Sequence, residues 1–310
     1  MTTPALTLDG LTVRIPTAAG TVHAATDVDL TLTAGQVHAL VGESGCGKSV
    51  VGAAICGLLP TAATVSGGIA LHRPGSADVH LEAARPRTWR KIRGRRIAWI
   101  PQSAATYLTP VRTVGEQLAE TCRHLDSPHT PAVLLTRVGL EPTVAGLYPH
   151  ELSGGMAQRA AIAFALAGDP QVIVADEPTS NLDPELTDHT LRLLRAAADA
   201  GAAVLLISHD LDTLPAHTDR VAVMYASRIV ETGPTADVFA DPWHPYTRDL
   251  LAALPSGGLH PIPGMPPVLT DLPGDCVYHQ RRPAPGFSGG PTHIAQHGDR
   301  SVRRLIGAAS

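Results

Sequence analysis

Eight consecutive residues near the start of the chain, at positions 42–49, match the phosphate-loop pattern G-x-x-x-x-G-K-S/T. The apolar run at 37–41 before them predicts a buried strand, and residues 50–56 after them predict a helix. In this setting, backbone N–H groups and a helix N-terminus surround phosphate oxygens. The predicted phosphate-binding residues are Gly42, Glu43, Ser44, Gly45, Cys46, Gly47, Lys48 and Ser49.

The loop lysine stands out against the composition of the chain. Lys48 and Lys91 are the only lysines in the sequence, and arginine supplies nearly all of the other positive charge. A lysine kept at position 48 against this bias indicates a specific role. We expect Lys48 to contact the β- and γ-phosphates of a nucleotide and the hydroxyl of Ser49 to ligate Mg²⁺.

Composition and charge exclude several classes of protein. A net charge of −4 argues against a nucleic-acid binder that works by bulk electrostatics. The four cysteines are scattered without a C-x-x-C pair, which predicts a reduced, cytosolic compartment and no disulfide framework. Residues 1–10 do not resemble a secretory signal, and no apolar run is long enough for a transmembrane helix.

The order of the predicted elements indicates an α/β fold with a mostly parallel core sheet. Residues 5–35 and 64–82 alternate polar and apolar positions, which predicts an antiparallel β-subdomain. A helical subdomain is predicted at about 103–168, where Thr113 and Glu116 form a capping-box pattern. We expect one ATPase-type domain over 1–254 and a loosely ordered Pro/Gly-rich extension over 255–310.

Polar side chains follow three of the predicted strands. Asp176 and Glu177 end the apolar strand 172–175, where the first carboxylate suits a Mg²⁺ shell and the second suits polarisation of an attacking water. Gln102 follows the strand 97–100, and its amide is placed to reach Mg²⁺ or water. His209 follows the strand 203–207, where an imidazole can hold a phosphate oxygen.

The segment Leu152-Ser153-Gly154-Gly155-Met156-Ala157-Gln158 opens a helix with a serine and two glycines, which predicts a second anion site. Together with the phosphate loop, Gln102, Asp176, Glu177 and His209, this segment resembles the ATP-binding subunit of an ABC transporter. LSGGMAQ resembles the signature motif of that family, and the resemblance covers roughly residues 5–254.

The resemblance implies a role for each motif. ATP and Mg²⁺ are the implied cofactors, and two subunits sandwich two ATP molecules head-to-tail. Gln102 would be the Q-loop glutamine, Glu177 the catalytic glutamate and His209 the switch histidine. Ser49, Gln102 and Asp176 would hold Mg²⁺. The residues implied to contact ATP beyond the phosphate loop are Ser153, Gly154, Gly155 and Gln158 of the signature and Asp183 of the D-loop.

A downstream element, His244-Pro245-Tyr246-Thr247-Arg248-Asp249-Leu250-Leu251, narrows the resemblance to the importers of oligopeptides, dipeptides and nickel. This group implies two membrane-spanning permease subunits, a second ABC ATPase subunit in a heterodimer and, indirectly, an extracytoplasmic solute-binding protein. It implies a peripheral location at the cytoplasmic face of the inner membrane and no nucleic-acid partner. We expect peptide import driven by ATP hydrolysis, with nickel or a metal–chelator complex as the alternative cargo.

Some features depart from this group, and one other class of function stays open. Ile15 stands where many relatives carry an aromatic residue against adenine, and Cys276 stands alone where relatives often have a cysteine-rich tail. A soluble ABC ATPase of DNA repair or translation is the alternative of another class. It is disfavoured because only about 100 residues without heptads separate Lys48 from Ser153 and because the chain has one ATPase unit.

Overall fold

The apolar runs identified in the sequence form buried strands in the computed structural model, which describes residues 3–73, 75–270, 272, 277–282 and 290–305. Every residue of β3 (Val37–Val41), β7 (Val172–Asp176) and β8 (Ala203–Ser208) is buried. Strands of a parallel sheet covered on both faces need such continuous apolar runs. The predicted α/β class, with parallel strands, a separate antiparallel sheet and helices, is confirmed.

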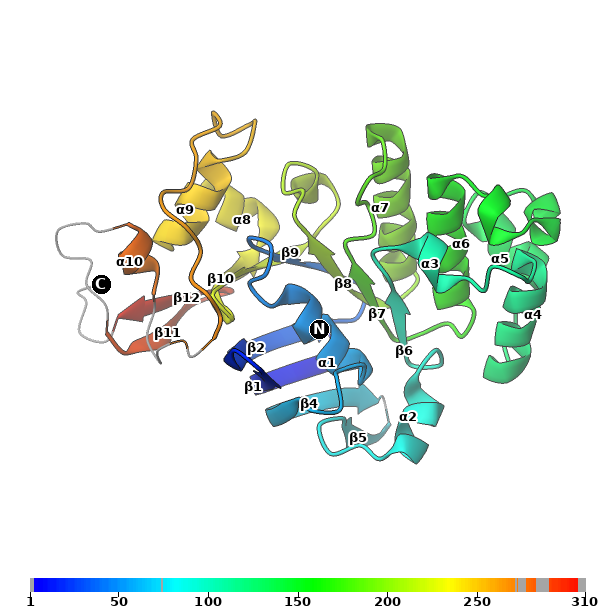
Figure 1. The fold of residues 1–310 in the computed structure, drawn as a ribbon, viewed down its shortest axis with the longest axis horizontal. Coiled ribbons are helices and arrows are strands. Elements are labelled where there is room, and N and C mark those ends of the chain that lie inside the picture. Colours follow the sequence, from blue (N-terminus) through cyan, green and yellow to red (C-terminus); the bar gives the residue numbers. More distant parts are fainter. Residues whose placement is uncertain (1–2, 74, 271, 273–276, 283–289, 306–310) are drawn as a thin grey trace. The chain divides into compact units, whose positions relative to one another are not determined.

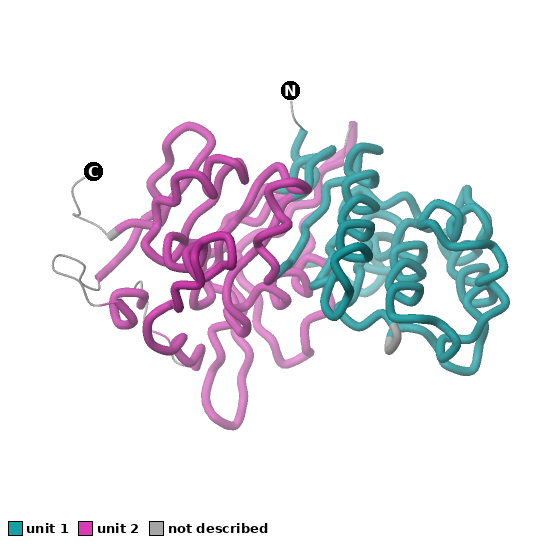
Figure 2. Tube along the Cα trace, turned by 90° about the horizontal axis from the view of Figure 1, so that it is seen from above, with its two compact units in different colours: residues 1–6, 32–37, 83–208 teal, residues 7–31, 38–82, 209–310 magenta. Residues whose placement is uncertain are grey.

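The chain forms two units whose residues interleave along the sequence (Figure 2). Unit 1 comprises residues 1–6, 32–37 and 83–208. Unit 2 comprises residues 7–31, 38–82 and 209–310. The expected boundary after residue 254 stays a prediction.

Unit 1 contains three parallel strands in register. β6 (Ile97–Ile100) pairs with β7, and β7 pairs with β8. Ile100 lies opposite Ala175, and Ala175 lies opposite Leu206. The carboxyl ends of the three strands therefore meet at one edge, and the polar residues that follow β6 and β7 begin there.

Figure 1 labels the helices of unit 1, and the helix predicted from the capping box is among them. Both hydrogen bonds of the predicted capping box form at Thr113 and Glu116. The segment 152–158, which was predicted to open a helix, begins one at Gly154, and residues 86–92 form a short helix that was not predicted. The helical elements are α2 (Pro86–Ile92), α3 (Ala104–Tyr107), α4 (Val114–Leu125), α5 (Pro131–Arg137), α6 (Gly154–Leu166), α7 (Pro184–Asp199) and the 3-10 turns Pro142–Gly146 and Pro149–Glu151.

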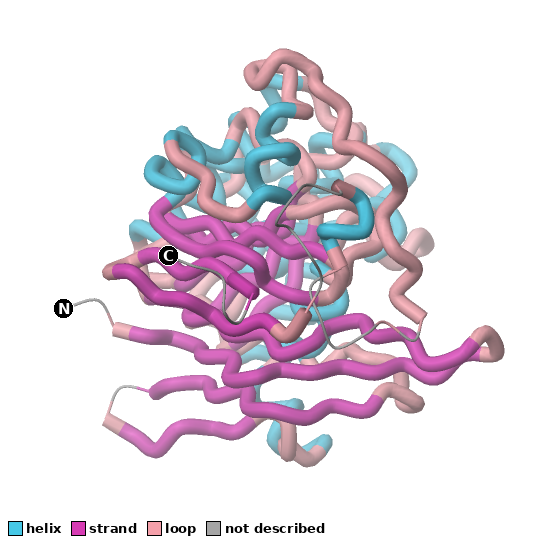
Figure 3. Tube along the Cα trace, turned by 90° about the vertical axis from the view of Figure 1, so that its left-hand side faces the viewer, coloured by secondary structure: helices cyan, strands magenta, loops and turns pink. Residues whose placement is uncertain are grey.

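Unit 2 carries most of an antiparallel sheet with the strand order β2-β1-β4-β5. β1 (Pro4–Thr17) and β2 (Gly20–Thr33) are long strands joined by a two-residue turn (Figure 3). β4 (Thr64–Arg73) pairs antiparallel with β5 (Ser76–His80). This sheet confirms the antiparallel strands that the alternating pattern predicted.

The second sheet region of unit 2 begins at the phosphate loop. β3 runs parallel to β9 (Arg220–Tyr225), which pairs antiparallel with β10 (Arg228–Pro234). β12 (Arg300–Leu305) pairs with β10, and β11 (Thr292–His297) pairs with β12. The helical elements of unit 2 are α1 (Lys48–Cys56), α8 (Thr235–Ala240), α9 (Pro245–Ala252), α10 (Tyr278–Arg281) and the 3-10 turn Leu214–Ala216.

The C-terminal hairpin corrects the expectation of a loosely ordered extension for residues 292–305. Glu231 of β10 lies opposite Val302, and Thr232 lies opposite Ser301. The hairpin has little apolar alternation, and arginines supply part of its buried surface. Arg300 and Arg303 are buried and pair with Glu231 and Asp27, contacts that join residues 69 and 276 positions apart. The hydrophobic pattern of a segment does not report ion pairs with distant residues, so the sequence of residues 292–305 predicted no strand.

Glu231 holds the segment around His244 against β10. Its carboxylate is fully buried and accepts hydrogen bonds from the N–H groups of Trp243 and His244, at 2.9 and 2.8 Å. The same carboxylate pairs with Arg300 at 2.9 Å. Nδ1 of His244 caps α9 by accepting a hydrogen bond from the N–H of Tyr246 at 3.1 Å. Burial, together with the positive charges of Arg303 and Arg248, lowers the pKa of His244 to about 3.

This buried histidine predicts a loss of stability in mild acid. His244 has a pKa of about 3 in the folded chain and one near 6.5 when unfolded, so the unfolded state binds more protons between these values. Stability is therefore retained above pH 6.5 and falls as the pH drops toward 3, by about 2 kcal/mol from pH 7 to pH 5. Urea unfolding at the two pH values measures this loss.

The control is His244→Asn, because an asparagine oxygen can cap α9 and does not titrate. We expect this variant to lose about 2 kcal/mol less than the wild type over the same pH interval. Equal losses in the two proteins would contradict the assignment to His244.

Candidate functional site

The phosphate loop leaves the carboxyl end of β3 and enters α1 at Lys48. Gly47 precedes the helix in a left-handed conformation, with φ 111°, and its carbonyl accepts hydrogen bonds from the N–H groups of Val50 and Val51. Ser44, Gly45 and Ser49 are exposed, whereas the side chain of Cys46 is buried and burial raises the pKa of its thiol. The strand–loop–helix geometry predicted from the motif is present in unit 2.

Neighbouring backbone fixes the two outer glycines of the loop. A Cβ atom on Gly42 would lie 2.1 Å from the carbonyl oxygen of Met224 in β9. A Cβ atom on Gly47 would lie 2.0 Å from the carbonyl oxygen of Ala24 in β2. Real Cβ atoms do not approach backbone this closely, and both glycines have positive φ angles. The motif glycines are therefore required by the contacts of the loop as well as by its conformation.

Lys48 is buried and bonded to its own loop. Its Nζ donates to the carbonyl oxygens of Gly42 and Glu43, at 2.7 and 3.0 Å. The ammonium group is thus held on the inner side of the loop by two backbone acceptors. An anion with several oxygens is the natural further partner for this group and for the N–H groups of the loop.

A hydrogen-bonded group forms in unit 1 where β6 and β7 end. Nε2 of Gln102 donates to Oε2 of Glu177 at 2.9 Å, and Oγ of Ser180 donates to the same oxygen at 3.1 Å. Glu177 has a φ angle of 45°, a conformation that non-glycine residues rarely adopt. The structure thus brings together Gln102 and Glu177, a contact that the sequence did not predict. Asp176, the last residue of β7, precedes Glu177 in the chain and is buried.

The signature segment begins α6. Ser153 caps the helix, since its Oγ accepts a hydrogen bond from the N–H of Met156 at 3.2 Å. Gly155 packs closely on Leu186 of α7, with 2.5 Å between a built Cβ and the leucine Cδ1. Gln158 is buried, and its Nε2 has no hydrogen-bond partner among the described residues. Asp183 caps α7 by accepting a hydrogen bond from the N–H of Leu186 at 2.9 Å.

The predicted site residues are divided between the two units. The phosphate loop and His209, which is exposed directly after β8, belong to unit 2. Gln102, Asp176, Glu177, the signature and Asp183 belong to unit 1. Their expected convergence on one nucleotide stays a prediction.

Two residues that contact the phosphate loop were not predicted from the sequence. The hydroxyl of Tyr246 accepts a hydrogen bond from the N–H of Glu43 at 3.0 Å, and Arg281 forms an ion pair with the carboxylate of Glu43. The element around Tyr246 was noticed only as a mark of a group of importers. Arg281 gave no local signal in the sequence, because its partner Glu43 lies 238 residues away.

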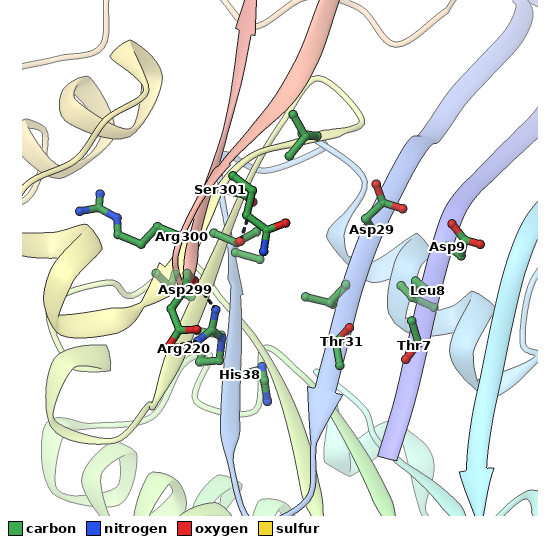
Figure 4. Close-up of a pocket in the computed structure, with 17 residues that line it drawn as sticks. Thr7, Leu8, Asp9, Asp29, Thr31, His38, Arg220, Asp299, Arg300 and Ser301 are labelled. Carbon is green, nitrogen blue, oxygen red and sulfur yellow. Dashed lines mark hydrogen bonds and ion pairs between the residues drawn. The ribbon is translucent and has the colours of Figure 1, made fainter. Parts of the chain in front are cut away.

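Unit 2 contains a cavity whose lining residues are drawn in Figure 4. It has a volume of about 500 Å³ and is lined in part by Asp9, Asp29, His38 and Arg220. Arg220 begins β9 and His38 lies near the start of β3, so the cavity adjoins the ends of these strands opposite the loop. Burial lowers the pKa of His38 to about 4, which keeps it neutral near pH 7.

The described residues hold no cluster of three or more His, Cys, Asp or Glu side chains arranged for a metal ion. Cys276, which stands alone where relatives often have a cysteine-rich tail, lies outside the described residues. No helix within the described ranges combines the length and apolar character that a bilayer crossing needs.

Comparison with known proteins gives two family matches and several relatives that align with most of this chain. Residues 25–180 match the family model "ABC transporter", and residues 230–285 match "Oligopeptide/dipeptide transporter, C-terminal region". A relative in Brucella abortus, named provisionally as a peptide import ATP-binding protein, is 38% identical over 97% of both chains. The dipeptide transport ATP-binding protein of Bacillus subtilis is 39% identical over 90% of this chain and 86% of its own.

Solved structures support the same architecture. An ATP-binding cassette solved as a dimer with ADP and phosphate gives a TM-score of 0.63 at 24% identity, over 74% of this chain and 98% of its own; this likeness concerns the fold alone. A subunit of an ABC transporter complex from Clostridium perfringens gives a TM-score of 0.61 at 26% identity. The match covers 77% of this chain and 91% of that subunit.

The contacts of the loop predict different costs for alanine at two of its glycines. Gly47→Ala forces a side chain against the carbonyl of Ala24, whereas Gly45→Ala meets nothing within 4 Å. Both positions have positive φ angles, so the second variant carries only the conformational cost, about 1 kcal/mol. We expect Gly47→Ala to lose about 3 kcal/mol, measured from urea unfolding curves. Equal losses would mean that the backbone around Gly47 yields freely.

Proposed function

This chain belongs to the ABC transporter family of ATPases, and we propose that it is the ATP-hydrolysing subunit of a peptide importer. The observation that carries the proposal is the match of residues 230–285 to the C-terminal region of oligopeptide and dipeptide transporters. The relatives named for dipeptide transport align with nine-tenths of the chain, so the likeness extends beyond the ATPase motifs.

In this function the phosphate loop binds the β- and γ-phosphates of ATP. Lys48 already lies on the inner side of the loop, where its ammonium group can exchange a backbone carbonyl for a phosphate oxygen. The N-terminus of α6, with the signature glycines, would face the γ-phosphate bound by a partner subunit. Positioning and charge neutralisation supply most of the catalysis in such a site.

Glu177 is the candidate for polarising the attacking water. The hydrogen bonds from Gln102 and Ser180 to Oε2 fix the direction of the carboxylate. We assign His209 to a γ-phosphate oxygen. Ser49, Gln102 and Asp176 would hold Mg²⁺, because a hydroxyl, an amide and a carboxylate supply the oxygen ligands that this ion prefers.

The partners follow from the same proposal. The chain would act with two permease subunits, a second ATPase subunit and, through the permeases, an extracytoplasmic solute-binding protein. It would lie peripherally at the cytoplasmic face of the inner membrane. Peptide cargo is favoured over nickel because the relatives reported above are named for peptides or dipeptides.

Two substitutions test the ATPase assignment. Glu177→Gln keeps the shape of the side chain and removes its basicity, so turnover by the purified transporter should fall at least about 100-fold while ATP still binds. Lys48→Ala removes a charge-assisted contact and should weaken ATP binding about tenfold or more. Isothermal titration and phosphate release measure these effects. Turnover of Glu177→Gln at the wild-type rate would contradict the role given to Glu177.

Uptake by whole cells tests the cargo. A strain lacking this chain should lose uptake of radiolabelled di- and tripeptides, and the wild-type chain but not Glu177→Gln should restore it. Loss of radiolabelled nickel uptake with peptide uptake intact would replace the peptide with the metal. Affinity purification that recovers DNA-repair proteins or ribosomes without permease subunits would overturn the transport function.

A further inference from the structure

Glu43 is a residue of the phosphate loop that contacts the C-terminal region, defined here as residues 230–285. All of its polar groups are engaged: its N–H donates to the hydroxyl of Tyr246 at 3.0 Å, and its carbonyl accepts from Nζ of Lys48 at 3.0 Å. Its carboxylate accepts from Nη1 and Nη2 of Arg281, at 2.5 and 3.3 Å. The phosphate-loop pattern leaves this position open, so the motif does not explain these contacts.

Both C-terminal partners are buried and are themselves held in place. The side chain of Arg281 is 5% exposed, and its Nε donates to the carbonyl of Pro263 at 2.9 Å. Tyr246 is fully buried, and burial raises its pKa, which keeps the hydroxyl protonated. An arginine with two bonds to one carboxylate fixes the direction of that carboxylate as well as its distance.

Aromatic packing around Tyr246 supports its contact with Glu43. Tyr246 lies 4.4 Å from Tyr225 and 5.3 Å from Tyr278, measured between ring centroids, and Tyr225 lies 5.1 Å from Tyr278. The chain has only five tyrosines, so three of them gather at this point. Aromatic pairs at these distances stabilise one another and leave little freedom to the hydroxyl that meets Glu43.

The same residue links the C-terminal region to the lysine of the loop. Lys48 bonds to the carbonyl of Glu43, and Arg281 bonds to the carboxylate of the same residue. A shift of Glu43 therefore moves an acceptor that fixes Lys48. A cavity of about 170 Å³ adjoins this point, lined by loop residues 43–46 and by Pro266, Pro267 and Leu269 of the extension.

We propose that Tyr246 and Arg281 are positioning residues of the ATP site, which hold Glu43 and through it set the phosphate loop and Lys48 in their binding shape. The inference rests on the proposed function, in that the loop binds ATP. It makes the C-terminal region a part of the nucleotide site in addition to any role in transport. Because coupling is reciprocal, bound nucleotide in turn stabilises the contact between the extension and the loop.

A double-mutant cycle tests the proposal on the full chain. Arg281→Gln and Glu43→Gln should each weaken ATP binding about tenfold, since each leaves a buried charged partner unpaired. The double variant should be no weaker than either single variant, because the pair acts as a unit. The apparent KM for ATP should rise in each of these variants, while kcat changes less than twofold. A general loss of stability would instead lower kcat.

Two further variants keep the test sharp. Arg282→Gln is the matched control: this neighbour of Arg281 pairs with Asp249 instead of the loop, and ATP affinity should stay at the wild-type value. Tyr246→Phe removes only the hydroxyl that accepts from Glu43 and should weaken ATP binding severalfold while the fold is kept. Thermal unfolding identifies any variant that fails to fold.

The outcomes separate this inference from the function on which it rests. Wild-type affinity in Tyr246→Phe and in folded Arg281→Gln would overturn the positioning role alone, since the wild-type chain would still bind ATP. Additive losses in the double variant would also overturn it. Failure of the wild-type chain to bind ATP would overturn the proposed function and this inference together.

Discussion

The shape of the phosphate loop depends on the close approach of two backbone carbonyls. The oxygens of Met224 and Ala24 occupy the space where side chains on Gly42 and Gly47 would lie. Strands β2 and β9, which supply these carbonyls, come from the two sheet regions of unit 2. The loop is therefore shaped by its surroundings, and its glycines are as much a packing requirement as a conformational one.

Much of this architecture could be predicted because its signals are local. The buried strand and the loop motif predicted the geometry at Lys48, and Thr113 with Glu116 predicted the start of a helix from capping chemistry alone. Gln102 and Glu177 were each predicted as polar residues at the end of a strand, whereas the pairing of these strands and the contact between the two side chains came from the structure.

The features that escaped prediction are held by contacts between residues far apart in the chain. Arg281 and Arg303 look like surface arginines in the sequence, yet each is buried against an acid more than 230 residues away. Burial of an arginine depends on the acid that neutralises it, and no local pattern names that acid. The C-terminal hairpin and the contact at Glu43 therefore came from the structure, whereas the nucleotide motifs came from the sequence.

The hairpin of β11 and β12 also changes how the sheet of unit 2 ends. β12 pairs with the backbone groups of β10 that face away from β9. The edge strand of the sheet is therefore β11, a six-residue strand with two histidines and a glutamine. Short, polar outer strands are poor templates for pairing with another chain. Removal of residues 292–305 would lay bare the hydrogen-bonding groups of β10 and its apolar neighbours. The hairpin thus replaces β10 at the edge of the sheet with a strand less suited to pairing with another chain.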